Sequence, residues 1–133
     1  MLTSYLKAMR RYGTFSGRAG RSEYWFFVLT VSLGALVLIA VDAATGTYSP
    51  RFVIGLLSGL WTAAHVLPGL AVSVRRLHDI DRSGWWLLLG GIPIGNLVVL
   101  VFHCLRGTPG PNRFGPAPDI ALEPALAPSR IVP

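Results

Sequence analysis

Three long stretches of the chain carry no Asp, Glu, Lys or Arg, and the charged residues lie between and outside them. The uncharged stretches are Tyr24–Val41, Phe52–Val74 and Ser83–Leu105, which contain 18, 23 and 23 residues. A helix that crosses the hydrocarbon core of a bilayer needs about 20 apolar residues. The pattern therefore predicts an all-α integral membrane protein with three transmembrane helices, at about residues 24–42, 52–74 and 85–105.

The two ends of the chain have a different pattern. Apolar residues recur at helical spacing near the start, with Lys7, Arg10 and Arg11 between them. This arrangement is typical of a short helix that lies on the membrane surface, although a disordered segment is equally compatible because two helical turns alone are marginally stable. The end is rich in Ala and Pro, which predicts a disordered tail at 119–133. Residues 1–118 are then expected to form one transmembrane domain.

Composition supports a membrane protein over a soluble one. Hydrophobic residues make up 52% of the chain and charged residues 14%, whereas soluble domains average about 25% charged residues. The net charge of +6 would suggest nucleic-acid binding in a soluble protein. Here the basic residues flank apolar segments, which favours anionic lipid headgroups and no nucleic acid. The single Cys104 excludes an internal disulfide.

The distribution of Lys and Arg predicts the orientation, because these residues concentrate on the cytoplasmic side. The head before the first span holds five, the first loop one, the second loop three and the tail three. Three crossings put the head and the second loop on one side with eight basic residues, and the first loop and the tail on the other side with four. The N-terminus is therefore expected to be cytoplasmic and the tail exoplasmic. A re-entrant hairpin broken at 90–95 would instead return the tail to the cytoplasm. We expect one kinked span, because about 21 residues at about 1.5 Å each make one crossing.

Polar and small residues inside the predicted spans mark two features. Small residues on one face of the second span let another helix approach closely, either within the chain or in a second copy. The residues of this packing stripe are Gly55, Ser58, Gly59 and Thr62. Each span also carries a polar residue near its middle, and these predict an intramembrane polar cluster of Ser32, His65 and Asn96. Such a cluster is compatible with helix packing or with a proton or solute path.

The second loop is the most highly charged patch of the chain. Its sequence from 75 to 84 is RRLHDIDRSG, in which Asp79 and Asp81 can pair with nearby arginines, and Asp81 or Ser83 can cap the third helix. Adjacent residues rarely converge on one ion, so we expect no metal site. No Ser or Cys accompanies a base in a recognisable catalytic arrangement, and we expect neither an enzyme nor a cofactor.

Three segments of the sequence resemble a known family. Residues 15–25 (FSGRAGRSEYW), residues 75–86 (RRLHDIDRSGWW) and residues 107–115 (GTPGPNRFG) are similar to the opening, central and closing motifs of domain-of-unknown-function family 805. The resemblance covers about residues 5–118. It implies a small bacterial multi-pass protein of the inner (plasma) membrane, and it brings no activity, substrate or cofactor with it.

The charged residues of the first two motifs predict a site at the cytoplasmic surface. They can bind lipid phosphate or a partner, or they can form an ion-pair network that fixes topology and helix register. The candidate residues are Arg18, Arg21, Glu23, Arg75, Arg76, His78, Asp79, Asp81 and Arg82. Glu23 is expected to pair with Arg75 or Arg76. The closing motif does not fit this site, since three crossings place it on the opposite side.

The leading functional hypothesis is therefore a non-enzymatic scaffold or interaction module, in which an Arg-rich cytoplasmic face engages anionic lipid or a partner protein. An oligomeric transporter or channel that uses His65 and Asn96 is a second hypothesis. A membrane enzyme acting on a lipid phosphate, with His78 and Asp79 as acid and base, is a third. The small-residue stripe also raises the prospect of a homo-oligomer.

Overall fold

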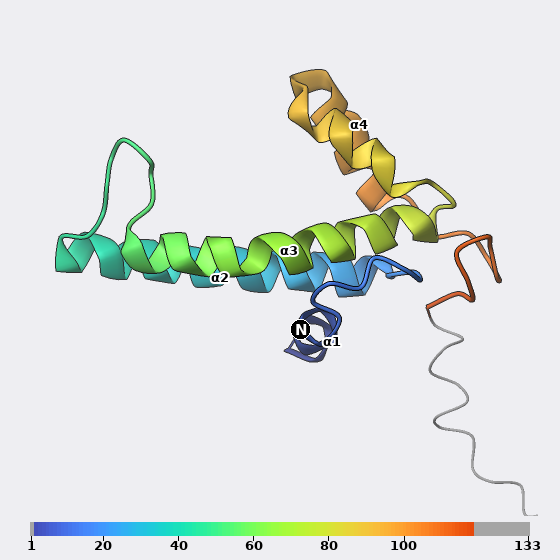
Figure 1. Ribbon diagram of the computed structural model, residues 1–133, viewed down its shortest axis with the longest axis horizontal. Coiled ribbons are helices and arrows are strands. Elements are labelled where there is room, and N and C mark those ends of the chain that lie inside the picture. Colours follow the sequence, from blue (N-terminus) through green and yellow to red (C-terminus); the bar gives the residue numbers. More distant parts are fainter. Residues whose placement is uncertain (1, 119–133) are drawn as a thin grey trace, which may run out of the picture. The chain divides into compact units, whose positions relative to one another are not determined.

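The computed structural model describes residues 2–118, which are helical and contain no β-strand. The helices are α1 (Leu2–Arg10), α2 (Arg21–Thr45), α3 (Leu56–Asp79), the 3₁₀ helix η1 (Gly84–Gly91) and α4 (Pro93–Cys104) (Figure 1). Within the domain predicted at 1–118, contacts form two compact units. The helical-pair unit contains residues 2–14 and 22–72, and the motif unit contains residues 15–21 and 73–118. The tail predicted at 119–133 lies outside the described residues.

Two helices, α2 and α3, are long and apolar enough to cross a membrane. They contain 25 and 24 residues, which corresponds to about 37 and 36 Å at about 1.5 Å per residue, against a hydrocarbon core of about 30 Å. Their most apolar windows are only 11% and 28% buried within the protein. Apolar surface of this extent that is left uncovered within the protein is typical of helices that contact a membrane or a partner. The first two predicted spans are therefore present as helices.

The helices α2 and α3 lie side by side and are joined by a loop at 46–55 (Figure 1). The two helices approach closely at Gly34 on α2, where an added Cβ would lie 2.5 Å from the Trp61 ring. The Trp61 indole Nε1 donates a hydrogen bond to the Val31 carbonyl at 3.0 Å. A small residue on α2 thus admits a large ring from α3, and the indole N–H is satisfied inside the pair.

Asp42, near the end of α2, accepts hydrogen bonds from the first N–H groups of α3. It is completely buried, and its carboxylate accepts hydrogen bonds from the Leu57 N–H at 3.0 Å, the Ser58 N–H at 2.8 Å and the Ser58 hydroxyl at 2.7 Å. The Thr47 hydroxyl donates a further bond at 2.7 Å. The first N–H groups of a helix lack partners within it, and a carboxylate supplies them. Asp42 therefore closes the loop by capping α3.

The N-terminal segment is a helix, as one of the two sequence interpretations expected, and it packs on the helical pair. The Tyr5 ring stacks on Phe27 with centroids 6.0 Å apart, and its hydroxyl lies 2.8 Å from His65 Nε2. His65 Nδ1 lies 2.7 Å from the Trp61 carbonyl, so Nδ1 carries the proton and Nε2 accepts from Tyr5. An ion pair of 2.8 Å joins Lys7 to Glu23.

The prediction of one kinked helix at 85–105 is wrong. The segment consists of η1, with 8 residues, and α4, with 12 residues. Between them Ile92 has an extended backbone (φ −114°, ψ 132°), and Pro93 is the first residue of α4. A residue before proline is pushed out of the helical region, and proline has no N–H for the preceding turn. The helix therefore ends before Pro93 and a new one begins there.

The segment from Gly84 to Cys104 turns back on itself as a hairpin. The rings of Trp86 and Phe102 meet edge to face with centroids 5.3 Å apart, and the Arg82 guanidinium lies 5.5 and 5.7 Å from the two ring centroids. At the turn, a Cβ added to Gly95 would overlap the Leu89 carbonyl, so only glycine permits the close return. Residue counting predicted a crossing because it cannot detect that the two ends pack together.

Candidate functional site

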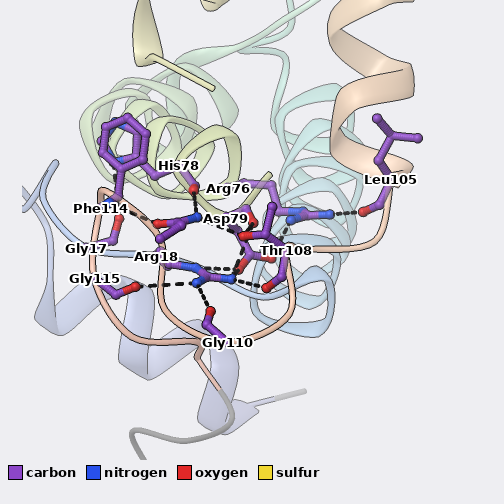
Figure 2. A network of polar contacts seen from close by, with 11 residues as sticks. Gly17, Arg18, Arg76, His78, Asp79, Leu105, Thr108, Gly110, Phe114 and Gly115 are labelled. Carbon is purple, nitrogen blue, oxygen red and sulfur yellow. Dashed lines mark hydrogen bonds and ion pairs between the residues drawn. The ribbon is translucent and has the colours of Figure 1, made fainter. Parts of the chain in front are cut away.

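The motif unit brings all three motif segments to one place. Residues 15–21 come from the segment before α2 and its first residue, residues 75–81 from the end of α3 and the two residues after it, and residues 107–115 from the segment after α4. Figure 2 shows side chains and carbonyls from these segments converging on Arg18, Arg76 and Asp79. The expectation that the closing motif lies apart from the other two is therefore wrong.

A buried ion-pair triad, formed by Arg18, Arg76 and Asp79, lies at the centre of the motif unit. Arg18 contacts Asp79 Oδ1 through Nη2 at 2.9 Å and through Nε at 3.0 Å. Arg76 Nη1 contacts the other oxygen, Oδ2, at 2.6 Å. The side chains are 1%, 0% and 5% exposed, respectively. A carboxylate shared by two guanidinium groups forms charge-assisted hydrogen bonds on both oxygens, which offset part of the cost of removing three charges from water.

Backbone carbonyls occupy the other donors of the two arginines. Arg18 donates to the carbonyls of Thr108 at 2.7 Å and Gly110 at 2.6 Å, with a longer bond of 3.4 Å to Gly115. Arg76 donates to the carbonyl of His103 at 3.2 Å and to that of Leu105. Arg18 thus ties the closing motif to the triad, and Arg76 ties the end of α4 to it. Both guanidinium groups therefore use their donors for contacts within the protein.

A second layer of contacts orders the closing motif against the end of α3. The rings of His78 and Phe114 stack in parallel, with centroids 3.9 Å apart and planes 3° from parallel. His78 Nδ1 hydrogen-bonds to the Gly17 carbonyl at 3.1 Å. The Asn112 amide donates to the His78 carbonyl and to the Thr108 hydroxyl, each at 2.9 Å. All three motifs therefore share one hydrogen-bonded structure.

Gly107 has a steric role in this arrangement. An added Cβ would overlap the Asp79 carboxylate, and the next residue, Thr108, donates its N–H to the Asp79 carbonyl at 2.8 Å. The backbone after α4 thus runs directly against the buried carboxylate, an approach that only a residue without a side chain allows.

An open cleft of about 700 Å³ lies beside the triad. Its charged lining residues are Arg18, Arg21, Arg106 and Asp79, and its other lining residues come from 107–110 and 117–118. Arg21 and Arg106 are exposed. Of the arginines that line the cleft, Arg18 is buried and bonded to the protein, whereas Arg21 and Arg106 present their charge to the surroundings.

The remaining charged candidates have separate places. Arg75 is buried, and its carbonyl accepts from the Ala19 N–H at 2.9 Å. Asp81 pairs with Arg113 at 3.1 Å, with both side chains largely exposed, while Arg82 lies against Trp86 and Phe102. Glu23 forms an ion pair with Lys7 in the helical-pair unit, and its expected pairing with Arg75 or Arg76 stays a prediction. Ser83 caps η1 by accepting from the Trp85 N–H at 3.4 Å.

The residues of the predicted polar cluster and packing stripe have the following contacts, and whether Ser32, His65 and Asn96 form one cluster stays a prediction. The His65 ring bonds to Tyr5 and to the Trp61 carbonyl, while Ser32 and Asn96 are exposed. In the stripe, Ser58 is buried through Asp42 and Gly55 lies against the same carboxylate. Gly59 meets only Ile54 of its own loop, and Thr62 bonds to the Ser58 carbonyl. Gly55 and Ser58 thus contact α2, and α2 and α3 also approach closely at Gly34. Packing of the stripe against a second copy stays a prediction.

Sequence reasoning missed several residues that build the site. Thr108, Gly110, Asn112 and Phe114 belong to a motif that was recognised but assigned to the other side of the membrane. The signal that could have placed them is the pair of helix breaks at 90–95, which allows the chain to return. Nothing in the sequence distinguished Asp42 as a cap, because its partners at 57 and 58 are reached only when the loop closes.

The chemical capability of the site follows from these bonds. Asp79 is bound by two arginines, and His78 uses Nδ1 for a structural hydrogen bond while its ring stacks on Phe114. Within residues 2–118 no group of three or more His, Cys, Asp or Glu side chains is arranged to hold a metal ion. The geometry is that of a structural junction beside a basic cleft.

Comparison with known proteins identifies the family. The chain matches the family described as "Protein of unknown function (DUF805)" over residues 12–116, and it therefore belongs to this family. Inner membrane protein YhaH of Escherichia coli (strain K12) is 47% identical over 121 residues, which cover 90% of this chain and 98% of that protein. Inner membrane protein YhaI of the same strain is 45% identical over 115 residues, covering 86% and 93%.

A more distant relative, Uncharacterized protein YiiR of Escherichia coli (strain K12), is 34% identical over 128 residues, which cover 77% of this chain and 84% of that protein. No solved structure matches the chain. The close relatives are inner membrane proteins, and the two long apolar helices agree with this location.

Proposed function

We propose that this member of the DUF805 family is a non-enzymatic, multi-pass inner-membrane module that engages anionic lipids at the cytoplasmic surface. In this proposal α2 and α3 cross the bilayer, the hairpin from Gly84 to Cys104 enters one leaflet and returns, and the N-terminus and the three motif segments (15–21, 75–81 and 107–115) are cytoplasmic. The observation that carries the proposal is the buried triad, because it joins segments that precede α2, end α3 and follow α4.

The bonds of Arg18 support an even number of crossings. Arg18 lies before α2, Asp79 ends α3, and Thr108 follows α4, and all three are within hydrogen-bonding distance of one another. Groups in direct contact occupy the same side of a bilayer. The chain between Arg18 and Asp79 then crosses twice, and the chain between Asp79 and Thr108 leaves and returns on one side.

The dimensions of the hairpin support entry into a single leaflet. Its arms, η1 and α4, have 8 and 12 residues, or about 16 and 18 Å at about 2.0 and 1.5 Å per residue. This is roughly half of the 30 Å hydrocarbon core. Large apolar side chains on both arms are exposed, including Leu88 at 70% and Ile94 at 78%. Trp85, Trp86 and Arg82 lie at the open end, the composition expected at headgroup level.

The distribution of charge supports a cytoplasmic location of the three motif segments. Among residues 2–118, which contain 11 of the 12 Lys and Arg residues of the chain, only Arg51 lies in the loop between α2 and α3. With two crossings, that loop is the only segment of residues 2–118 on the far side, so the counts are ten against one. Positively charged segments remain cytoplasmic. The predicted orientation of the N-terminus is retained, and the closing motif moves to the cytoplasmic side.

The bonding of the motif unit supports a module without catalytic chemistry. A lipid phosphatase would need His78 or Asp79 available for proton transfer. Instead, His78 Nδ1 is hydrogen-bonded to the Gly17 carbonyl and Asp79 is paired with two arginines. A solute path through His65 would need its ring nitrogens available, whereas they are hydrogen-bonded to Tyr5 and to the Trp61 carbonyl. The excess of basic side chains at the membrane surface favours attraction of anionic headgroups, each worth about 1 kcal/mol.

The crossings can be tested with cysteine probes in a Cys104→Ser background. Cysteines replacing Trp86 and Phe102 are expected to be bridged within one chain by a short bifunctional maleimide, because the two rings that they replace are in contact. In a continuous helix, 16 residues would separate them by about 24 Å. Single cysteines at the exposed Ser16, Pro50 and Pro116 test the sides. Labelling of Pro116→Cys from the same side as Pro50→Cys would refute the two-crossing topology.

The lipid preference can be tested on the wild-type protein in vesicles. Energy transfer from its tryptophans to pyrene-labelled phosphatidylglycerol should exceed transfer to labelled phosphatidylcholine, and the difference should shrink at about 1 M salt. The control is a single-span helix of neutral flanks in the same vesicles. Equal transfer to the two lipids at low salt would reject the lipid-engaging role while leaving the topology untouched.

A further inference from the structure

The cleft beside the triad contains positive charge that the described residues, 2–118, do not neutralise. Asp79 is the one carboxylate that lines it among residues 2–118, and that carboxylate is shared between Arg18 and Arg76. The triad therefore carries a net charge of +1. Arg21 and Arg106 raise the charge around the cleft to +3. A concave site with one sign of charge attracts and concentrates ligands of the opposite sign.

The two outer arginines have their donors available. Arg21 and Arg106 are exposed, and no hydrogen bond or ion pair connects either side chain to another residue of the part of the chain that the structure describes. Arg113, by contrast, is exposed but bonded to Asp81 through Nε at 3.1 Å and Nη2 at 3.0 Å. The cleft thus combines exposed guanidinium groups with a wall already fixed by internal bonds.

The wall of the cleft is rigid and chemically suited to an oxyanion. Arg18 holds the carbonyls of Thr108 and Gly110, which fixes the segment from which Arg106 projects. Pro109 and Pro118 also line the cleft and restrict the backbone there. The cleft volume of about 700 Å³ exceeds that of one phosphate and falls within the usual range of small-molecule sites.

We propose that this cleft binds the phosphate group of an anionic molecule, with Arg21 and Arg106 as the two guanidinium ligands and the buried triad as the frame that positions them. Guanidinium groups recognise phosphate oxygens through paired N–H donors. The proposal rests on the proposed function only in placing the cleft at headgroup level. The phosphate belongs either to a membrane lipid or to a soluble molecule, which share this chemistry.

The test uses the full chain in a neutral detergent at low salt, with binding measured by isothermal titration calorimetry. The probes are inorganic phosphate, glycerol 3-phosphate, short-chain phosphatidic acid and short-chain phosphatidylcholine. Arg21→Gln and Arg106→Gln are each expected to weaken binding of the anionic probes about tenfold or more, the loss expected for one charge-assisted contact. Arg113→Gln removes the same charge from an exposed arginine outside the cleft and is expected to change binding less than twofold.

The outcomes separate the two sources of phosphate. Cleft-dependent binding of phosphatidic acid without binding of inorganic phosphate or glycerol 3-phosphate supports a lipid headgroup. Cleft-dependent binding of all three anions supports recognition of the phosphate group itself. Equal losses in Arg106→Gln and Arg113→Gln would overturn the proposal, since they would indicate general charge attraction, and so would the absence of binding by wild-type protein. Neither result would alter the crosslinking test of the two-crossing topology.

Discussion

Removal of the Asp79 charge tests whether the motif unit is held together by its buried triad. In Asp79→Asn the side chain keeps its size, but two guanidinium groups that are 1% and 0% exposed lose their shared counter-charge. Removing one partner of a buried ion pair costs about 3–5 kcal/mol, because an unpaired charge remains buried. Since two arginines depend on this carboxylate, the upper part of that range is expected. That cost is comparable with the total stability of many proteins, about 5–15 kcal/mol.

The matched control is Asp81→Asn, two residues along the chain. Asp81 also pairs with an arginine, but the side chains of Arg113 and Asp81 are 61% and 45% exposed. Solvent screens such a pair, so the expected loss is between zero and about 1 kcal/mol. Both variants would be unfolded in detergent micelles, with tryptophan fluorescence as the signal, and compared with wild type. A loss below about 1 kcal/mol in Asp79→Asn, indistinguishable from the control, would refute the structural role of the triad.

Two further predictions use glycines and controls of the same type. Gly107→Ala should lower the free energy of unfolding by about 1–3 kcal/mol, because its Cβ would overlap the buried carboxylate, whereas Gly90→Ala, with open space around it, should change it by less than about 0.5 kcal/mol. Gly34→Ala should cost a similar 1–3 kcal/mol by displacing Trp61. Gly59→Ala, which meets only an ordinary contact at 3.7 Å, should be neutral or stabilise α3 by up to about 1 kcal/mol. Chemical unfolding measures the stability of all four variants. A loss of stability in Gly59→Ala larger than that in Gly34→Ala would indicate that another helix packs closely against the predicted stripe at Gly59.

The structure also distinguishes arginines that form internal ion pairs from arginines that are exposed and can bind a ligand. Arg18 and Arg76 are neighbours of the cleft in space, but their donors are used by Asp79 and by carbonyls. The alternative of an ion-pair network therefore describes these two residues. Binding of headgroups remains a hypothesis for Arg21 and Arg106, of which Arg106 was not among the residues singled out from the sequence.

From the sequence alone it was possible to predict which segments are apolar enough to enter a membrane and which segments contain the charged and polar residues of the family motifs. Transfer of a helix into hydrocarbon depends on the composition of that segment, so α2 and α3 could be located without knowledge of their neighbours. The same holds for α1, whose apolar spacing is local. The three motif segments and the family were also identifiable from contiguous residues.

How these segments meet depends on tertiary contacts and could not be read from the sequence. The pairing of Arg18 with Asp79 joins residues 61 positions apart, and the return of the last hydrophobic segment depends on packing of Trp86 against Phe102 and on a glycine at the turn. Composition shows that such a segment is apolar, but it does not show whether its ends lie on opposite sides or together. Burial also divides the arginines into those that hold the fold and those that face the cleft, because that division depends on which carbonyls and carboxylates surround each guanidinium group.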